Sequence, residues 1–153
     1  QGMLVIMDAG GGGDILPGTN TADDSVGVFQ GCSYTDPTSG KPTFKNFYPG
    51  SITASDIVAQ VYDDPKIVYE VQCDGTLAQA SVGANADTTS MTAGSTVTGK
   101  SSGEISATTA SGTAQLRIIG ISKDPDNNDQ ASANTNAYVL INEHAYSQTT
   151  GTK

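Results

Sequence analysis

A two-residue alternation in the apolar segments of this chain restricts it most strongly to β-structure. In KIVYEVQC, residues 66–73, the odd-numbered positions are Ile, Tyr, Val and Cys, and Val, Glu and Gln stand between them. Successive side chains of a strand point to opposite faces, so this pattern predicts a half-buried strand with one apolar face.

Further segments rich in β-branched and aromatic residues are separated by Gly, Pro, Asp and Asn clusters. VGVFQGCSY, residues 26–34, places Val26, Val28, Cys32 and Tyr34 less regularly on one face. Short strands joined by such turns are typical of an all-β fold. The other expected strands cover residues 43–48, 56–62, 114–121 and 136–146. Two segments could instead form short helices: residues 55–61, and about one turn within GTLAQASVG (75–83).

The chain of 153 residues is long enough for one domain with its own core. We expect a single antiparallel β-sandwich or barrel over residues 26–148, followed by a flexible tail at 149–153. Residues 1–25 include a run rich in Gly, Asp and Thr, which predicts an extended N-terminal arm. Residues 84–113 are dominated by Gly, Ala, Ser and Thr and are expected to form a long hairpin excursion.

Charge restricts the partners. The chain has 16 acidic and 7 basic residues, a net charge of −9. Such a chain does not neutralise phosphates, so we expect no nucleic-acid partner. No apolar run approaches the roughly 18–20 residues that span a bilayer, and we expect no membrane partner.

The sequence offers little catalytic chemistry. His144 is the only histidine and is interpreted as an ordinary residue of the last strand. Cys32 and Cys73 are expected to be free, buried thiols, with a bridge between them as the alternative. Zinc is disfavoured because no close-spaced pair of ligands occurs. We therefore expect neither an enzyme nor a cofactor.

The acidic sequence KDPDNND, residues 123–129, is the one candidate for a metal site. Asp124, Asp126 and Asn128 have the spacing of the first three ligands in a calcium loop. The glycine required at the sixth position is replaced by Asp129, and the carboxylate required at the twelfth by Thr135. We interpret the segment as a turn between two strands, with a looser calcium site as the weaker alternative.

Aromatic residues gather in one stretch of the chain. Tyr34, Phe44, Phe47 and Tyr48 lie within 15 residues. Aromatic side chains are enriched in the cores of protein interfaces, so these four are the candidate interface residues. The alternative is that they fill the core of the domain.

Several longer segments carry a resemblance to a known class of proteins. They are GVFQGCSYTDPTSGKPTFKNFYPG, DDPKIVYEVQCDG, LRIIGISKDPDNND and, shortly after it, NAYVLINEH. Together they resemble small structural proteins of tailed-bacteriophage virions, the capsid decoration or stabilising (cement) proteins. The resemblance spans about residues 26–146. It implies a non-enzymatic β-module on the outer surface of the capsid, assembled in the cytoplasm of the host bacterium.

The implied partners are the phage major capsid protein and neighbouring copies on the shell, or a homo-oligomer. We expect the 1–25 arm and the aromatic stretch to make these contacts. The alternative function is a receptor- or carbohydrate-binding β-module, as in a spike, a fibre or a secreted surface domain.

Overall fold

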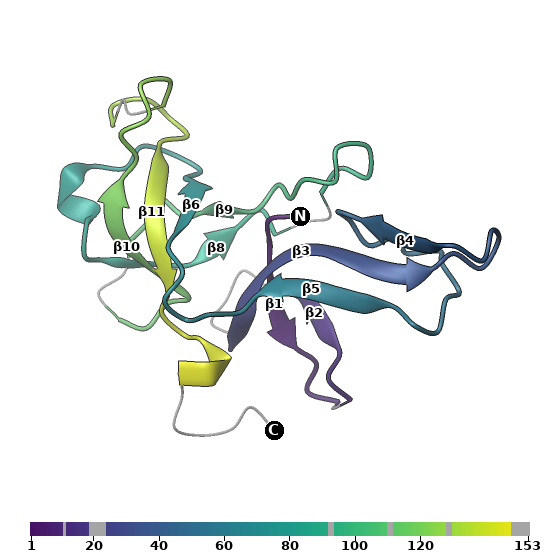
Figure 1. The fold of residues 1–153 in the computed structure, drawn as a ribbon. Helices are drawn as coiled ribbons and strands as arrows, with labels where there is room; N and C mark the ends of the chain where they lie inside the picture. The colour runs from purple at the N-terminus through teal and green to yellow at the C-terminus, as the bar shows by residue number, and fades with distance from the viewer. Residues whose placement is uncertain (11, 19–23, 92–93, 110–111, 128–129, 148–153) are drawn as a thin grey trace.

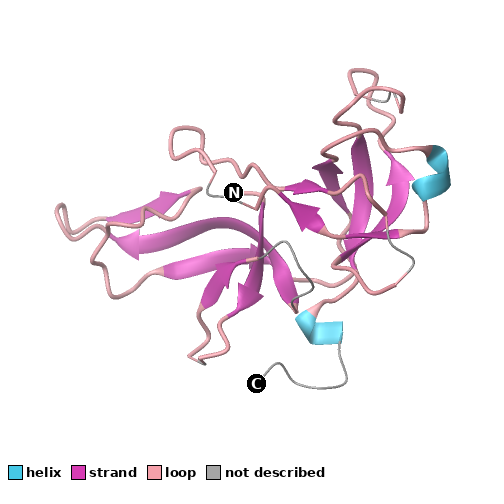
Figure 2. Ribbon diagram, turned by 180° about the vertical axis from the view of Figure 1, so that it is seen from behind, coloured by secondary structure: helices cyan, strands magenta, loops and turns pink. Residues whose placement is uncertain are grey.

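The protein is all-β, and its strands pair antiparallel, as the alternation predicts. The computed structural model describes residues 1–10, 12–18, 24–91, 94–109, 112–127 and 130–147. Short 3₁₀ turns at Gln79–Ser81 (η1) and Ala145–Ser147 (η2) are the helical elements of this part of the chain (Figure 2). None of the described helices is long and apolar enough to cross a membrane.

The first sheet is built around one long strand, β3 (Ser25–Thr35). One side of β3 pairs with β1 (Met3–Met7) along its first half and with β4 (Pro42–Lys45) along its second half. β5 (Val58–Tyr62) pairs along the opposite side. β2 (Ile15–Pro17) completes the sheet by pairing with β1. The short helix considered at 55–61 is therefore wrong, because this segment supplies a strand.

The expected N-terminal arm needs correction, because residues 1–25 contribute to this sheet. β1 and β2 form a hairpin, and Leu4 and Val5 are buried. The apolar sequence MLVIM pairs with β3, which satisfies backbone groups of the strand, while Met3, Ile6 and Met7 stay partly exposed. Within the run that predicted an arm, Gly10, Gly12 and Gly13 lie in the turn between β1 and β2, and Ile15–Pro17 form β2 itself. Of these residues, 11 and 19–23 lie outside the described part of the chain.

The second sheet has the order β6–β11–β10–β7, and a third, two-stranded sheet lies beside it. β6, β10 and β11 confirm the expected apolar segments, although they are shorter than predicted, whereas β7 was not expected. Their bounds are Tyr69–Gln72 (β6), Asn85–Ala86 (β7), Leu116–Ile121 (β10) and Asn136–Ile141 (β11). The third sheet consists of β8 (Thr88–Thr89) and β9 (Glu104–Ile105).

The Ser- and Thr-rich segment forms the expected hairpin excursion, since β8 and β9 pair antiparallel. Its far end reaches the first sheet. There the Asn46 side-chain amide donates to the Thr98 carbonyl at 3.1 Å, and the Ser101 N–H donates to the Gln1 carbonyl at 2.8 Å. Where the excursion leaves the second sheet, Ala86 and Ile105 are fully buried.

The main apolar core lies within the second and third sheets. Leu77 enters it from the loop before η1, and Leu4 enters it from β1. The other buried members of this cluster come mostly from the second sheet: Cys73, Ala86, Ile105, Leu116, Ile118, Ile121, Ala137, Val139 and Ile141. The core therefore joins the second sheet to the first half of β3 and leaves the far half of the first sheet outside it.

A β-bulge changes which side chains of β3 share a face. The register against β5 shifts between Phe29 and Gly31. As a result, Val28 lies on the face opposite to Cys32, although the sequence placed both on one face. Val28 packs against the main core.

Beyond the bulge, the first sheet extends away from the rest of the molecule. We call this part the wing: residues 31–35 of β3 together with β4 and β5. In Figure 1 the wing projects to the side opposite β10 and β11. Phe44 of β4 and Val58 and Tyr62 of β5 are exposed here, whereas Cys32 and Tyr34 of β3 are buried.

Candidate protein-interaction surface

One face of the wing exposes apolar side chains. Ser33 lies opposite Phe44 on one side and opposite Val58 on the other, so the three side chains share this face. Tyr62 lies on the same face, four residues after Val58 along β5. Phe44, Val58 and Tyr62 are 51%, 60% and 47% exposed. We call this surface the wing face.

Gly31 leaves room for the Phe44 ring on the wing face. A side chain at residue 31 would lie 2.5 Å from the Cζ atom of Phe44 and 2.6 Å from the Lys45 carbonyl oxygen. The absence of a side chain therefore lets the Phe44 ring lie across β3. This contact buries Gly31 while leaving half of Phe44 in solvent.

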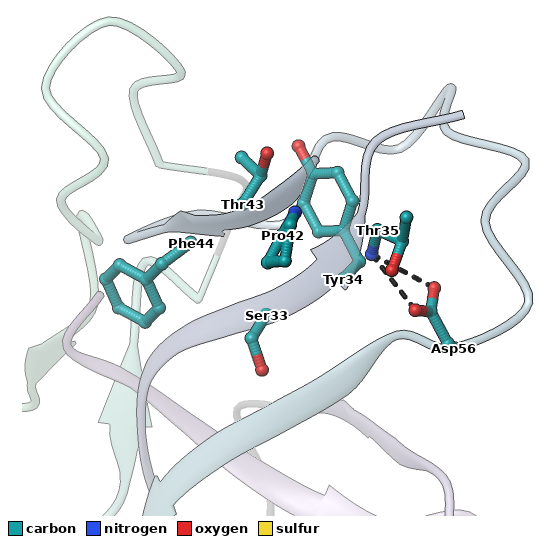
Figure 3. A pocket seen from close by; sticks show the side chains of 7 residues that line it. All are labelled: Ser33, Tyr34, Thr35, Pro42, Thr43, Phe44 and Asp56. Carbon is teal, nitrogen blue, oxygen red and sulfur yellow. Dashed lines mark hydrogen bonds between the residues drawn. The ribbon is translucent and has the colours of Figure 1, made fainter. Parts of the chain in front are cut away.

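A shallow, open hollow of about 390 Å³ lies at the end of the wing. Its lining includes Phe44, the hydroxyl residues Ser33 and Thr35, and Asp56 (Figure 3). The Thr35 N–H donates to both carboxylate oxygens of Asp56, each at 3.1 Å. These hydrogen bonds lower the pKa of Asp56, so the hollow carries a negative charge at neutral pH.

The four aromatic residues predicted as an interface differ in their exposure. Tyr34 is only 5% exposed and belongs to the interior of the wing, which corrects its assignment. Phe47 is partly buried, with the Lys45 ammonium 5.4 Å from its ring centroid. Phe44 and Tyr48 are each more than half exposed. The alternative that these residues fill the interior therefore holds for Tyr34.

Val58 and Tyr62 were not among the predicted interface residues. The sequence did contain a signal, since VAQVY is apolar at both phases of the alternation. A strand of this kind is either covered on both faces or exposed at an interface. Only the structure shows that β5 is exposed.

The acidic turn is described only in part. The Asp124 carboxylate accepts a hydrogen bond from the Asp126 N–H at 3.0 Å, and the Asp124 carbonyl accepts one from the Asn127 N–H at 2.9 Å. This arrangement matches the expected turn between β10 and β11. Asn128, the third candidate calcium ligand, lies outside the described residues. No group of three or more His, Cys, Asp or Glu suited to a metal occurs in the described part of the chain.

Both cysteines are buried free thiols, as expected. Cys73 belongs to the main core, and Cys32 lies in the wing, where its thiol is 3.5 Å from the Phe47 carbonyl oxygen. Burial raises the pKa of both thiols. Both side chains therefore stay protonated at neutral pH and contribute as small apolar groups.

Hydrogen bonds join the two sheets at the base of the wing. The Tyr69 hydroxyl donates to the Tyr62 carbonyl at 2.9 Å, and the Ser25 N–H donates to the Glu143 carbonyl at 2.9 Å. Burial, and then Asp63 and Asp64, raise the pKa of Tyr69 to about 12. The hydroxyl therefore remains a donor throughout the physiological pH range.

His144 lies in this joint and is fully buried, rather than lying on the last strand as expected. It follows β11 and forms a parallel bridge with Ser25. Its Nδ1 accepts a hydrogen bond from the Tyr146 N–H at 3.1 Å. Its Nε2 makes no hydrogen bond with any described residue. Burial lowers the pKa of His144, although the Asp63 and Asp64 carboxylates oppose part of the effect.

We expect the free energy of unfolding to fall as the pH drops below about 6.5, the ordinary pKa of histidine. His144 has a lowered pKa in the folded state, so the unfolded state binds its proton first. One such group changes the stability by at most about 1.4 kcal/mol per pH unit. Urea unfolding of the native chain and of His144→Gln between pH 7.5 and 5 measures this effect.

The variant should show a flatter dependence on pH over that range. The lowered pKa values of Asp36 and Asp56 act in a separate range, because their stabilising effect is lost only as the pH falls below about 3.8. If the free energy of unfolding depended on pH equally in the native chain and in His144→Gln, the buried imidazole would not be the cause of that dependence.

Comparisons with known proteins gave no relative. No protein-family profile matches the chain, and neither a curated protein nor a solved structure is significantly similar to it.

Proposed function

We propose that this chain is a non-enzymatic structural protein of a phage virion, which binds the outer surface of the capsid and decorates or stabilises the shell. The wing face is the observation that carries the proposal. It exposes Phe44, Val58 and Tyr62 on paired strands, and none of the three belongs to the main core. Exposed apolar side chains grouped in this way are typical of surfaces that bind another protein.

Charge and repetition add to this argument. A net charge of −9 suits a protein outside the shell better than one in contact with packaged DNA. Neighbouring copies on a lattice also raise the effective concentration of each binding site, so a small surface is sufficient for stable occupancy. The segments that resemble decoration proteins include β3, β4, β6, β10 and β11.

A second candidate is a carbohydrate- or receptor-binding module. The hollow in Figure 3 favours it, since its lining combines the exposed Phe44 ring with the hydroxyl residues Ser33, Thr35 and Thr43. The Asp56 carboxylate in the hollow already accepts two contacts from Thr35, which leaves it fewer free positions for a ligand.

Counting copies per particle tests the proposal. We expect quantitative mass spectrometry of purified virions to find hundreds of copies, as regular decoration of a shell requires. A handful of copies would instead favour a spike or fibre, and absence from virions would overturn the proposal. Deletion of residues 1–25 is not a suitable test, because it would remove β1 and the buried Leu4 and Val5.

A further inference from the structure

β5 is an edge strand whose outer side is unpaired within the described chain. It pairs with β3 along one side only. Figure 1 shows it running beside β3 into the wing. An edge strand presents N–H and C=O groups outward, and these can pair with a strand of another molecule.

β5 lacks the features that usually protect an edge strand. Natural edges are blocked by Pro, by charged side chains, or by being very short. The neighbouring free edges have such features: β4 contains Pro42 and Lys45, and β2 is three residues long and ends at Pro17. The sequence of β5, VAQVY, contains neither Pro nor a charge. The edge is thus open to pairing.

The side chains of β5 also favour a bound strand. Val58 and Tyr62 are exposed on the wing face, and Ala59 is exposed on the opposite face. An added strand would lie beside these residues, and side chains at alternate positions would meet Val58 and Tyr62. Apolar side chains at those positions would bury apolar surface on both molecules.

The charges near β5 determine which partner fits. Asp56 precedes the strand, and Asp63 and Asp64 follow it, with Lys66 as the single nearby cation in sequence. Three carboxylates and one ammonium give this segment a net charge of −2. A strand with positive charges near its ends would therefore be favoured.

The same charges disfavour a second copy of this chain. Antiparallel pairing centred on Gln60 would place Asp56 beside the Asp64 of the other copy. Parallel pairing in register would place Asp63 beside Asp63. Each copy also carries a net charge of −9, so both arrangements bring like charges together.

We propose that β5 binds an extended segment of the shell protein as an additional strand, with apolar side chains at alternate positions of that segment and Lys or Arg near its ends. This inference rests on the proposed function, since it takes the major capsid protein as the partner. It adds the mode of attachment and the chemistry of the segment that binds.

The test uses phage particles assembled without this protein, to which purified variants are added. Val58→Lys should bind at least about tenfold more weakly than the native chain, because it removes an apolar contact and repels a basic segment. Val58→Glu should lose less affinity, because its charge attracts that segment. Ile119→Lys is the matched control: Ile119 is also an exposed strand residue, at 41%, but lies on β10 in the second sheet. It should bind like the native chain.

Hydrogen exchange identifies the pairing directly. Amides of residues 58–62 that face outward should exchange more slowly on the particle, and thermal unfolding should confirm that all variants are folded. If the native chain does not bind the particles, the proposed function fails, and this inference fails with it.

If the native chain and Val58→Lys bind equally, or β5 gains no protection, only the attachment through β5 is overturned. A loss with Val58→Glu as large as with Val58→Lys would overturn the basic character of the segment. A concentration-dependent dimer of the native chain that Val58→Lys abolishes would show that a second copy occupies the edge.

Discussion

Replacing Gly27 with alanine should lower the free energy of unfolding by about 3 kcal/mol or more, since overpacking against rigid backbone is among the costliest changes. Gly27 is a buried residue of β3, opposite Val5 of β1. A Cβ atom at this position would overlap the Tyr62 carbonyl oxygen and lie 3.0 Å from the Cα atom of Asp63. These are backbone atoms at the base of the wing and cannot turn aside as the end of a side chain can.

Urea unfolding followed by circular dichroism measures this effect. Gly50→Ala is the matched control, because nothing lies within 4 Å of a Cβ atom built at residue 50. It should leave stability within about 0.5 kcal/mol of the native value, as surface substitutions usually do. If Gly27→Ala were as stable as Gly50→Ala, β3 and the end of β5 would not approach each other as closely as described.

Replacing Leu77 with alanine should cost about 2–5 kcal/mol of stability, the range for deletion of a fully buried leucine side chain. Leu77 is 0% exposed and packs in the main core, although it lies in a loop rather than in a strand. Side chains in a protein core are closely packed, so the neighbours of Leu77 cannot easily fill the space that the substitution leaves.

The same unfolding measurement with Leu16→Ala provides the control. Leu16 lies in β2 and is 45% exposed, so its truncation removes much less buried surface. We expect a loss of less than about 1 kcal/mol. Equal losses for the two variants would contradict the central position of Leu77 in the core.

The sequence predicted the strands of the second sheet well. Ile67, Tyr69, Val71 and Cys73 are all less exposed than the residues between them, as the alternation required. The 3₁₀ turn at Gln79–Ser81 confirms the single helical turn allowed for GTLAQASVG. These features depend on neighbours in sequence, so local patterns are sufficient to predict them.

The candidate surface was less predictable. Tyr34 and Phe44 are both aromatic residues of adjacent strands, yet one is buried and the other is exposed. The bulge between Phe29 and Gly31 moves the side chains of β3 that follow it to the face opposite to the one that the alternation predicts. The apolar pattern of the sequence does not reveal such a bulge. Gly31 then determines how the Phe44 ring lies.

By itself, the sequence determined that this chain forms antiparallel β-structure and carries a strongly negative charge. The alternation of side chains and the composition are sufficient for those conclusions. Only the tertiary structure decided that MLVIM joins the first sheet, that β5 lies at an open edge, and that His144 is buried between the sheets. Each of these depends on pairing between residues distant in sequence, and the pattern within a strand does not specify its partner.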